Sequence, residues 1–166
     1  MPFTPFHLGP ALAIGLPLRK IIHTPTFIIA NLIIDIEPFT VMILRLRYPL
    51  HGYLHTFISA IIVGILLGYF MYKLEKLLHE LYDELLLTPI YHRNLKPYII
   101  AGTTGTVIHV LLDSPMYYDI KPFCPLTINP LFNPELTIII YDLCGLMFIA
   151  GIIYYILLLI MYKGKH

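Results

Sequence analysis

The sequence predicts an all-α fold, a polytopic transmembrane helical bundle of four to five membrane segments, in a single integral membrane domain covering residues 1–166. The first reason is composition, since 58% of the residues are hydrophobic and 13% are charged, whereas a soluble domain is usually about 25% charged. The second is the presence of apolar runs of roughly 20 residues, the length that crosses a bilayer as a helix. The net charge of +1 offers no basic surface that would attract nucleic acid, so we expect no nucleic-acid partner.

The N-terminal region contains two short apolar segments, residues 6–18 and 21–36, separated by Arg19 and Lys20. Both are shorter than the roughly 20 residues that a spanning helix needs. They are expected to form either two short spans or a re-entrant hairpin. Both alternatives return the end of the second segment to the face where the first begins.

The rest of the chain contains three further apolar runs and two polar segments. Residues 52–72 and 138–162 are long enough for transmembrane helices, and 97–114, which opens on a proline, is a third predicted span. Residues 73–87 place leucines at helical spacing among charged residues, which predicts an amphipathic interfacial helix. Residues 115–137 contain Asn-Pro pairs, which favour turns, so we expect an ordered outer loop there.

Basic residues predict the orientation in the cell membrane, because short cytoplasmic loops carry the excess of Lys and Arg. With the N-terminus outside and the C-terminus cytoplasmic, the outer side carries only Arg45, Arg47 and Lys121. The inner side then carries Arg19, Lys20, Lys73, Lys76, Arg93, Lys96, Lys163 and Lys165.

Ionisable side chains gather at the outer face of this topology. Such groups are costly at membrane depth and usually face a cavity or one another. Because both arrangements of the N-terminal segments bring these positions to one level, the convergence does not depend on that choice. The residues concerned are His7, Asp35, Glu37, His51, His55, His109 and Asp113.

Helical spacing brings several of these groups together in pairs, since residues four apart share a helix face. The pairs are His51 with His55, His109 with Asp113, and Asn31 with Asp35. Imidazole and carboxylate ligands suit a divalent metal, with zinc favoured, manganese or iron as alternatives, and one or two ions. We expect the metal ligands to be His7, Asp35, His55, His109 and Asp113, and His51 and Glu37 to serve in proton transfer or to support the ligands.

Other interpretations of these residues need no metal. Asp113 could simply be the hydrogen-bond partner of His109, and His51 could be an ordinary residue at a helix start. Asp142 is a weaker candidate for closing the site from the last span. The remaining histidines are expected to be solvated or interfacial: His23, His79, His92 and His166.

Four segments, MPFTPFHLGPALAIG, ANLIIDIEPF, HGYLHTF and GTVIHVLLDS, resemble the membrane-bound, metal-dependent hydrolase family that includes the LexA-regulated YdjM-like proteins. The resemblance covers most of the chain and keeps the four motifs in order. It implies hydrolase activity and a membrane lipid substrate carrying an ester or phosphoester. It also implies six site residues: His7, Asp35, His51, His55, His109 and Asp113.

Two other functions fit the same composition. A small cation or proton transporter could use the same His and Asp residues as a relay. Such a pathway needs polar groups reaching both faces, and the inner halves of the predicted spans offer little beyond Thr103, Thr104 and Thr106. A structural membrane protein, alone or as an oligomer, would need none of these groups for its function.

Overall fold

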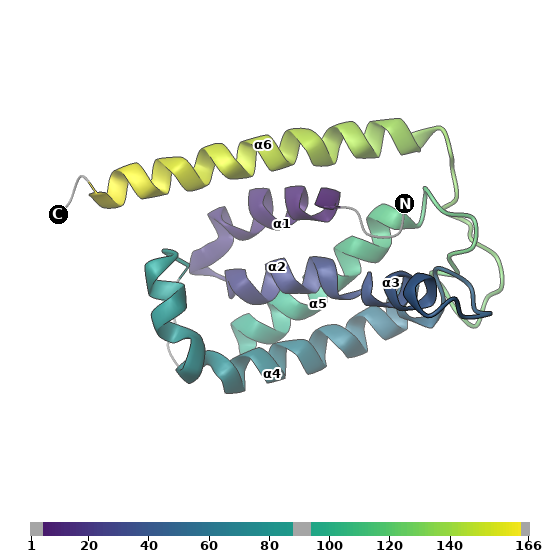
Figure 1. The fold of residues 1–166 in the computed structure, drawn as a ribbon, viewed down its shortest axis with the longest axis horizontal. Coiled ribbons are helices and arrows are strands. Elements are labelled where there is room, and N and C mark those ends of the chain that lie inside the picture. The colour runs from purple at the N-terminus through teal and green to yellow at the C-terminus, as the bar shows by residue number, and fades with distance from the viewer. Residues whose placement is uncertain (1–4, 88–93, 164–166) are drawn as a thin grey trace.

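The computed structural model describes residues 5–87 and 94–163, and all regular structure in these residues is helical. The predicted all-α bundle is therefore confirmed, and Figure 1 shows its long helices lying roughly alongside one another. Three short 3-10 helices in the described residues precede α1, α2 and α4: Pro5–His7, Pro17–Lys20 and Tyr53–His55. The α-helices are α1 (Leu8–Gly15), α2 (Thr24–Ile33), α3 (Ile36–Ile43), α4 (Phe57–Glu84), α5 (Lys96–Asp113) and α6 (Leu136–Lys163).

Three stretches of the described chain are long and apolar enough to cross a membrane: Thr24–Ile43, Phe57–Glu84 and Leu136–Tyr162. The last two contain most of the spans predicted at 52–72 and 138–162. The run predicted at 97–114 does form α5, but α5 is not among the three. Lys96, His109 and Asp113 lower its mean hydropathy more than its glycines and threonines do, and the helix packs between α2 and α4.

The N-terminal segments form an antiparallel pair of short helices. The pair is held by the hydroxyl of Thr24, which donates to the carbonyl of Gly15 at 2.9 Å. With 8 and 10 residues, α1 and α2 are about 12 and 15 Å long, much less than the roughly 30 Å of a bilayer core. Only by continuing through the break at Ile34 and Asp35 into α3 does the second segment reach spanning length. The pair therefore brings the start of α3, which directly follows Asp35, back to the end of the bundle where α1 begins (Figure 1).

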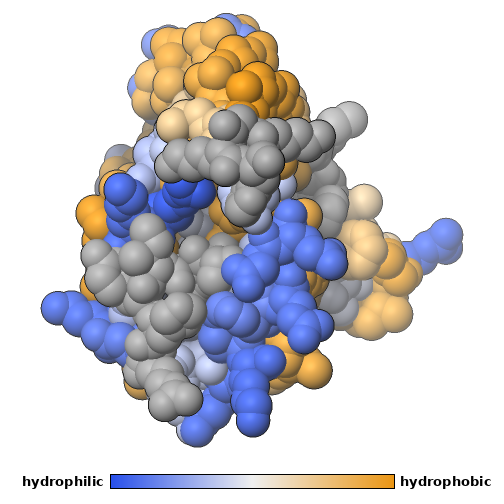
Figure 2. All heavy atoms as spheres, turned by 90° about the vertical axis from the view of Figure 1, so that its left-hand side faces the viewer, coloured by the Kyte–Doolittle hydropathy of each residue, from blue (hydrophilic) through white to orange (hydrophobic). Residues whose placement is uncertain are grey.

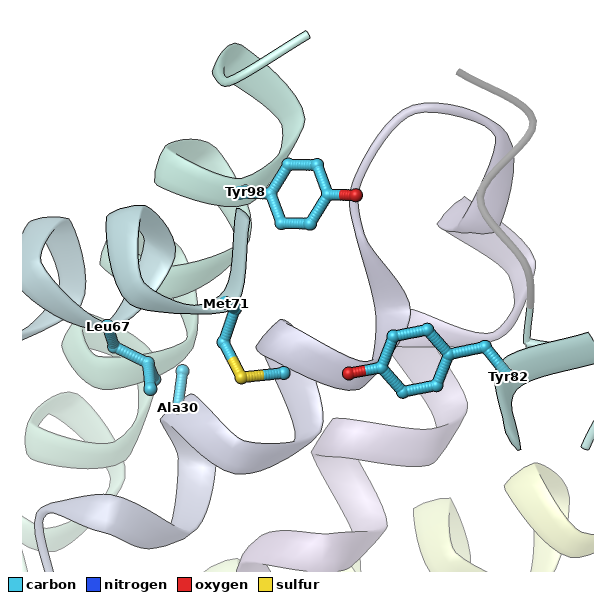
Figure 3. Close-up of a cluster of buried hydrophobic side chains, with 5 residues drawn as sticks. All are labelled: Ala30, Leu67, Met71, Tyr82 and Tyr98. Atoms are coloured by element: carbon cyan, nitrogen blue, oxygen red, sulfur yellow. The ribbon is translucent and has the colours of Figure 1, made fainter. Parts of the chain in front are cut away.

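Small residues allow α4 and α5 to approach closely. A Cβ atom added to Gly102 would overlap the carbonyl oxygen of Gly64, and one added to Gly68 would lie 2.6 Å from the carbonyl oxygen of Tyr98. Helix contacts of this kind depend on small side chains because lipid provides little driving force for association between helices. Apolar side chains fill the spaces on either side, as in the cluster of Figure 3: Ala30, Leu67, Met71, Tyr82 and Tyr98.

The predicted amphipathic segment, 73–87, is helical to Glu84 as a continuation of α4. Figure 1 shows this last part of α4 turning toward α1 and α6. Its end is held by Arg19, whose guanidinium donates to the Leu86 carbonyl at 3.4 Å, and by Tyr155, whose hydroxyl donates to the Leu85 carbonyl at 3.0 Å. Hydrophilic side chains gather at this end of the bundle (Figure 2).

Residues 114–135 form turns without a helix and fold against the opposite end of the bundle. The side-chain amide of Asn129 donates to the carbonyls of Ser114 and Tyr117, at 2.7 and 3.0 Å. The backbone N–H of Phe57 donates to the Pro122 carbonyl at 2.9 Å. These bonds fix the loop against the start of α4 and the end of α5.

Candidate metal centre

The seven residues predicted to converge lie together and are buried at one end of the bundle. The 3-10 turn before α1 places His7, the break between α2 and α3 places Asp35, and the first turn of α3 places Glu37. The last two turns of α5 place His109 and Asp113. The remaining two, His51 and His55, lie in the segment that leads into α4, whose first turn is capped by the Thr56 hydroxyl accepting from Ser59 N–H at 3.1 Å.

Asp113 lies at the centre of the group. Its Oδ1 atom is 3.1 Å from Nε2 of His7. Its Oδ2 atom is 3.4 Å from Nε2 of His109 and 3.8 Å from Nε2 of His55. The Asp35 carboxylate completes one side, with Oδ1 3.5 Å from Nε2 of His109. One carboxylate thus faces three imidazole nitrogens from three different segments.

Two sets of possible ligands share this carboxylate. In each set, one ligand atom per residue can be chosen so that all lie within 4.8 Å of one another. The first set is His7, Asp35, His109 and Asp113, and the second is His51, His55 and Asp113. Every residue in both sets is buried. Asp113 is therefore placed where a carboxylate could bridge two ions.

Three of the histidines are oriented in the same way. The Nδ1 atom of His109 lies 2.7 Å from the backbone carbonyl of Asn31, and that of His55 lies 2.9 Å from Oε2 of Glu37. The Nδ1 atom of His51 lies 3.0 Å from Oδ1 of Asp119. Carbonyl and carboxylate oxygens only accept hydrogen bonds, so Nδ1 carries the proton, and a neutral ring keeps the Nε2 lone pair free. Histidine ligands of metals are commonly held this way.

The Glu37 carboxylate is fully used by neighbouring donors. Its Oε2 accepts from the Gly52 N–H at 2.9 Å as well as from His55, and its Oε1 accepts from the Leu54 N–H at 3.2 Å. The Tyr48 hydroxyl also donates to Oε1 at 3.2 Å. Burial raises the pKa of the Tyr48 phenol, so this hydroxyl keeps its proton. Glu37 therefore fixes the segment that carries His51 and His55.

The carboxylates at this end have histidines as their only basic partners in the described part of the chain. The buried carboxylates of Asp35, Glu37 and Asp113 and the partly buried one of Asp119 pair with histidines, and none of the four pairs with Lys or Arg within residues 5–87 and 94–163. An uncompensated buried carboxylate is costly. Three buried ring nitrogens also have no hydrogen-bond partner among the described residues: Nδ1 of His7, Nε2 of His55 and Nε2 of His109. Both features fit a bound cation.

Some residues of the site are not indicated by the sequence pattern. Asp119 belongs to the loop, and besides the His51 ring it accepts the His51 N–H at 3.2 Å. The Tyr117 ring lies against His51, with centroids 4.2 Å apart, and burial together with a hydrogen bond to Tyr141 raises the pKa of its phenol. Asn31, which helical spacing pairs with Asp35, contributes its backbone carbonyl and not its side chain, which bonds to the Phe27 carbonyl. No spacing rule points to a loop carboxylate or a main-chain oxygen.

Outside the main group, the structure does not support the weak candidate Asp142, and the expectation for His23 is wrong. Asp142 is exposed and belongs to neither set of ligands in the described chain. His23, expected to be solvated or interfacial, is fully buried at the opposite end. Its Nδ1 accepts from the Thr26 N–H at 3.3 Å, and its Nε2 lies 3.1 Å from Oε2 of Glu75. His79 is partly exposed, and His92 and His166 lie outside the described residues.

No protein-family model, curated protein or solved structure matches this chain.

Proposed function

We propose that this chain is a membrane-embedded, metal-dependent hydrolase that acts on a lipid ester or phosphoester at the outer membrane face. The observation that carries the proposal is the common orientation of His51, His55 and His109. Each Nδ1 is bound to an oxygen acceptor, and in His55 and His109 the Nε2 atom faces Asp113. The resemblance of the four segments to the YdjM-like hydrolases supports the same reaction class.

The metal in this proposal is a divalent cation, with zinc favoured by the mixed imidazole and carboxylate ligands. The first ion would be held by His7, Asp35, His109 and Asp113, and His55 with Asp113 would begin a second site. Two divalent ions would balance the four carboxylates at this end of the bundle. A divalent ion with an open position lowers the pKa of a bound water from 15.7 toward about 7 and so supplies hydroxide near neutral pH.

The protein's own groups have separate tasks in this proposal. Glu37 orients His55 and fixes the surrounding backbone. Of the two roles expected for Glu37, proton transfer and support of the ligands, this is the second. His51 is oriented by Asp119 and would transfer protons when a single ion is bound. With two ions bound, His51 would instead complete the second set of ligands.

Metal content tests the proposal directly. Purified protein should carry one or two zinc, manganese or iron ions per chain, measured by elemental mass spectrometry. The double variant His109→Ala, Asp113→Ala should lose the metal. The partly exposed His79 is a matched control, and His79→Gln should keep it. Wild-type protein without stoichiometric metal, together with a double variant that behaves like wild type, contradicts the proposal.

A cation or proton transporter is the second candidate, because ionisable groups are also buried at the opposite end. His23 stacks on Tyr98, with ring centroids 4.1 Å apart, and contacts Tyr82 edge-on. The hydroxyl ends of Tyr82 and Tyr98 point toward the same region in Figure 3, and Glu75 reaches His23 from α4. Ion flux into protein-containing liposomes that is abolished by both His109→Ala and His23→Ala would favour this function over hydrolysis.

A further inference from the structure

A cavity of about 430 Å³ lies beside the metal centre. Its wall includes His51 and Asp119 together with Tyr48, Tyr53, Tyr118 and Lys121. This volume is within the range of about 300–1,000 Å³ that is usual for small-molecule sites. The cavity is partly open, and two residues of its wall, Tyr53 and Tyr118, are 70% and 80% exposed.

The cavity and the metal centre meet at His51. His51 lines the cavity, and the same residue belongs with His55 and Asp113 to one set of possible ligands. The fully buried ligand His109 does not line the cavity. A molecule in the cavity would therefore approach the centre from the His51 side.

Lys121 supplies the free charge of the cavity wall. The carboxylate of Asp119, the acidic residue of the wall, is already bound to the ring and the backbone N–H of His51. Lys121 is exposed and forms no salt bridge with residues 5–87 or 94–163. An ammonium group that lines a cavity without a partner attracts an anion, and lysine commonly binds phosphate as a point charge.

The tyrosines indicate where the ligand comes from. Tyr53 and Tyr118 expose most of their rings beside the loops at this end of the bundle. Tyrosine is enriched at the level of lipid headgroups, where its apolar ring and polar hydroxyl suit the interface. This favours a ligand held in the bilayer over one that arrives from solution.

We infer that this cavity binds the phosphate-bearing headgroup of a membrane phospholipid, with Lys121 contacting the phosphate and His51 facing the bond that is cleaved. The inference rests on the proposed hydrolase function and narrows its substrate to a phosphoester. In the reaction, a water oxygen forms a bond to phosphorus and the bond from phosphorus to the leaving alcohol oxygen breaks. The proton released by the water ends on that alcohol, so no further reactant is needed.

The test compares Lys121 variants in detergent micelles, with short-chain phosphatidic acid as the probe. Metal content, probe binding and release of inorganic phosphate are measured for each variant. Lys121→Gln should weaken probe binding and raise KM for the probe roughly tenfold, as expected from loss of one charge-assisted contact. Lys121→Arg should stay within about threefold of wild type, because it keeps the charge. Lys20→Gln, at an exposed position at the opposite end, should leave metal content, probe binding and phosphate release unchanged.

The possible outcomes separate this inference from the function on which it rests. Loss of metal from wild-type protein contradicts the hydrolase proposal itself. Normal metal content with equal probe binding by wild type and Lys121→Gln overturns only the headgroup site. Inorganic phosphate that competes as tightly as the phospholipid overturns the lipid source in favour of a soluble phosphoester. A neutral diacylglycerol that binds as tightly as phosphatidic acid overturns the selection for phosphate.

Discussion

His55 donates its Nδ1 hydrogen to Oε2 of Glu37, 2.9 Å away, although the two residues belong to different segments. The same carboxylate accepts the backbone N–H groups of Gly52 and Leu54. One acidic side chain from α3 thus orders the turn before α4 and sets the direction of the His55 ring. In the proposed metal centre, this relationship gives Glu37 the role of orienting the ligand His55 without being a ligand itself.

Replacing Glu37 by Gln should lower metal affinity about 10- to 100-fold, the usual effect of losing a group that orients a ligand. The amide places an NH₂ group among donors, so at least one of the bonds from Gly52, Leu54 and His55 is lost. Competition with a chromogenic chelator measures the change. Glu135→Gln, at an exposed loop position, is the control and should bind like wild type. Equal affinity for both variants would show that Glu37 does not hold His55 in its binding orientation.

Replacing Asp119 by Asn should act on His51 and leave the first set of ligands intact. The substitution weakens the acceptor for the His51 ring and backbone, while His7, Asp35, His109 and Asp113 keep their contacts. If the protein binds two ions, stoichiometry should fall toward one. If it binds one, turnover should fall at least tenfold with metal content unchanged. Asp142→Asn, at an exposed position on α6, is the matched control.

The sequence predicts the convergence of the site better than its details. Alternating membrane segments fix the level of each residue, so His7 and Asp35 could be assigned to the same face even with the N-terminal hairpin undecided. Asp119 could not, because its position depends on how a loop without periodicity folds back. His23 was misjudged for a related reason: a basic, proline-rich connection usually faces water, and burial of His23 comes from contacts with Glu75 and Tyr98, distant in sequence.

Hydropathy likewise identifies α4 and α6 as long apolar helices better than it identifies α5, which packs between other helices. The runs in α4 and α6 are apolar because much of their surface is exposed in the protein. Helix α5 is surrounded by other helices and therefore needs small residues more than apolar ones. Gly102 and Gly105 serve this need, since a Cβ atom at Gly105 would lie 2.6 Å from Cβ of Ala30. The helix predicted at 97–114 is confirmed, but α5 is less apolar than the predicted span.

Removing the metal should destabilise the folded protein. A ligand that binds only the folded state at 100 times its dissociation constant stabilises it by about 2.7 kcal/mol, and its removal also leaves the buried carboxylates without a counter-ion. Treatment with a chelator should therefore lower the thermal midpoint in detergent, and added zinc should restore it. The same treatment of the double variant His109→Ala, Asp113→Ala should have no effect. An unchanged midpoint in metal-loaded wild-type protein would contradict this prediction.

Gly102→Ala should destabilise the contact between α4 and α5 by about 1–3 kcal/mol, the usual cost of overpacking. The added methyl group meets the backbone of Gly64, which cannot move as a flexible side chain would. At Gly145 on α6, a Cβ atom would have no neighbour within 4 Å, so Gly145→Ala should be neutral or stabilising by up to about 1 kcal/mol. Thermal unfolding in detergent compares the two. Similar midpoints would show that the helices can separate without cost.

Labelling of Cys124 tests the predicted orientation. Cys124 is partly exposed and lines the cavity beside the metal centre, whereas the other cysteine, Cys144, is buried in α6. With Cys144→Ser as background, a membrane-impermeant maleimide should label Cys124 in intact cells. The excess of basic residues at the opposite end of the bundle predicts that the opposite end is cytoplasmic and that this end faces outward. In a chain carrying Cys124→Ser, Cys144→Ser and Lys20→Cys, labelling should require permeabilised cells. The reverse pattern would place the metal centre at the cytoplasmic face and exclude a substrate from the outer leaflet.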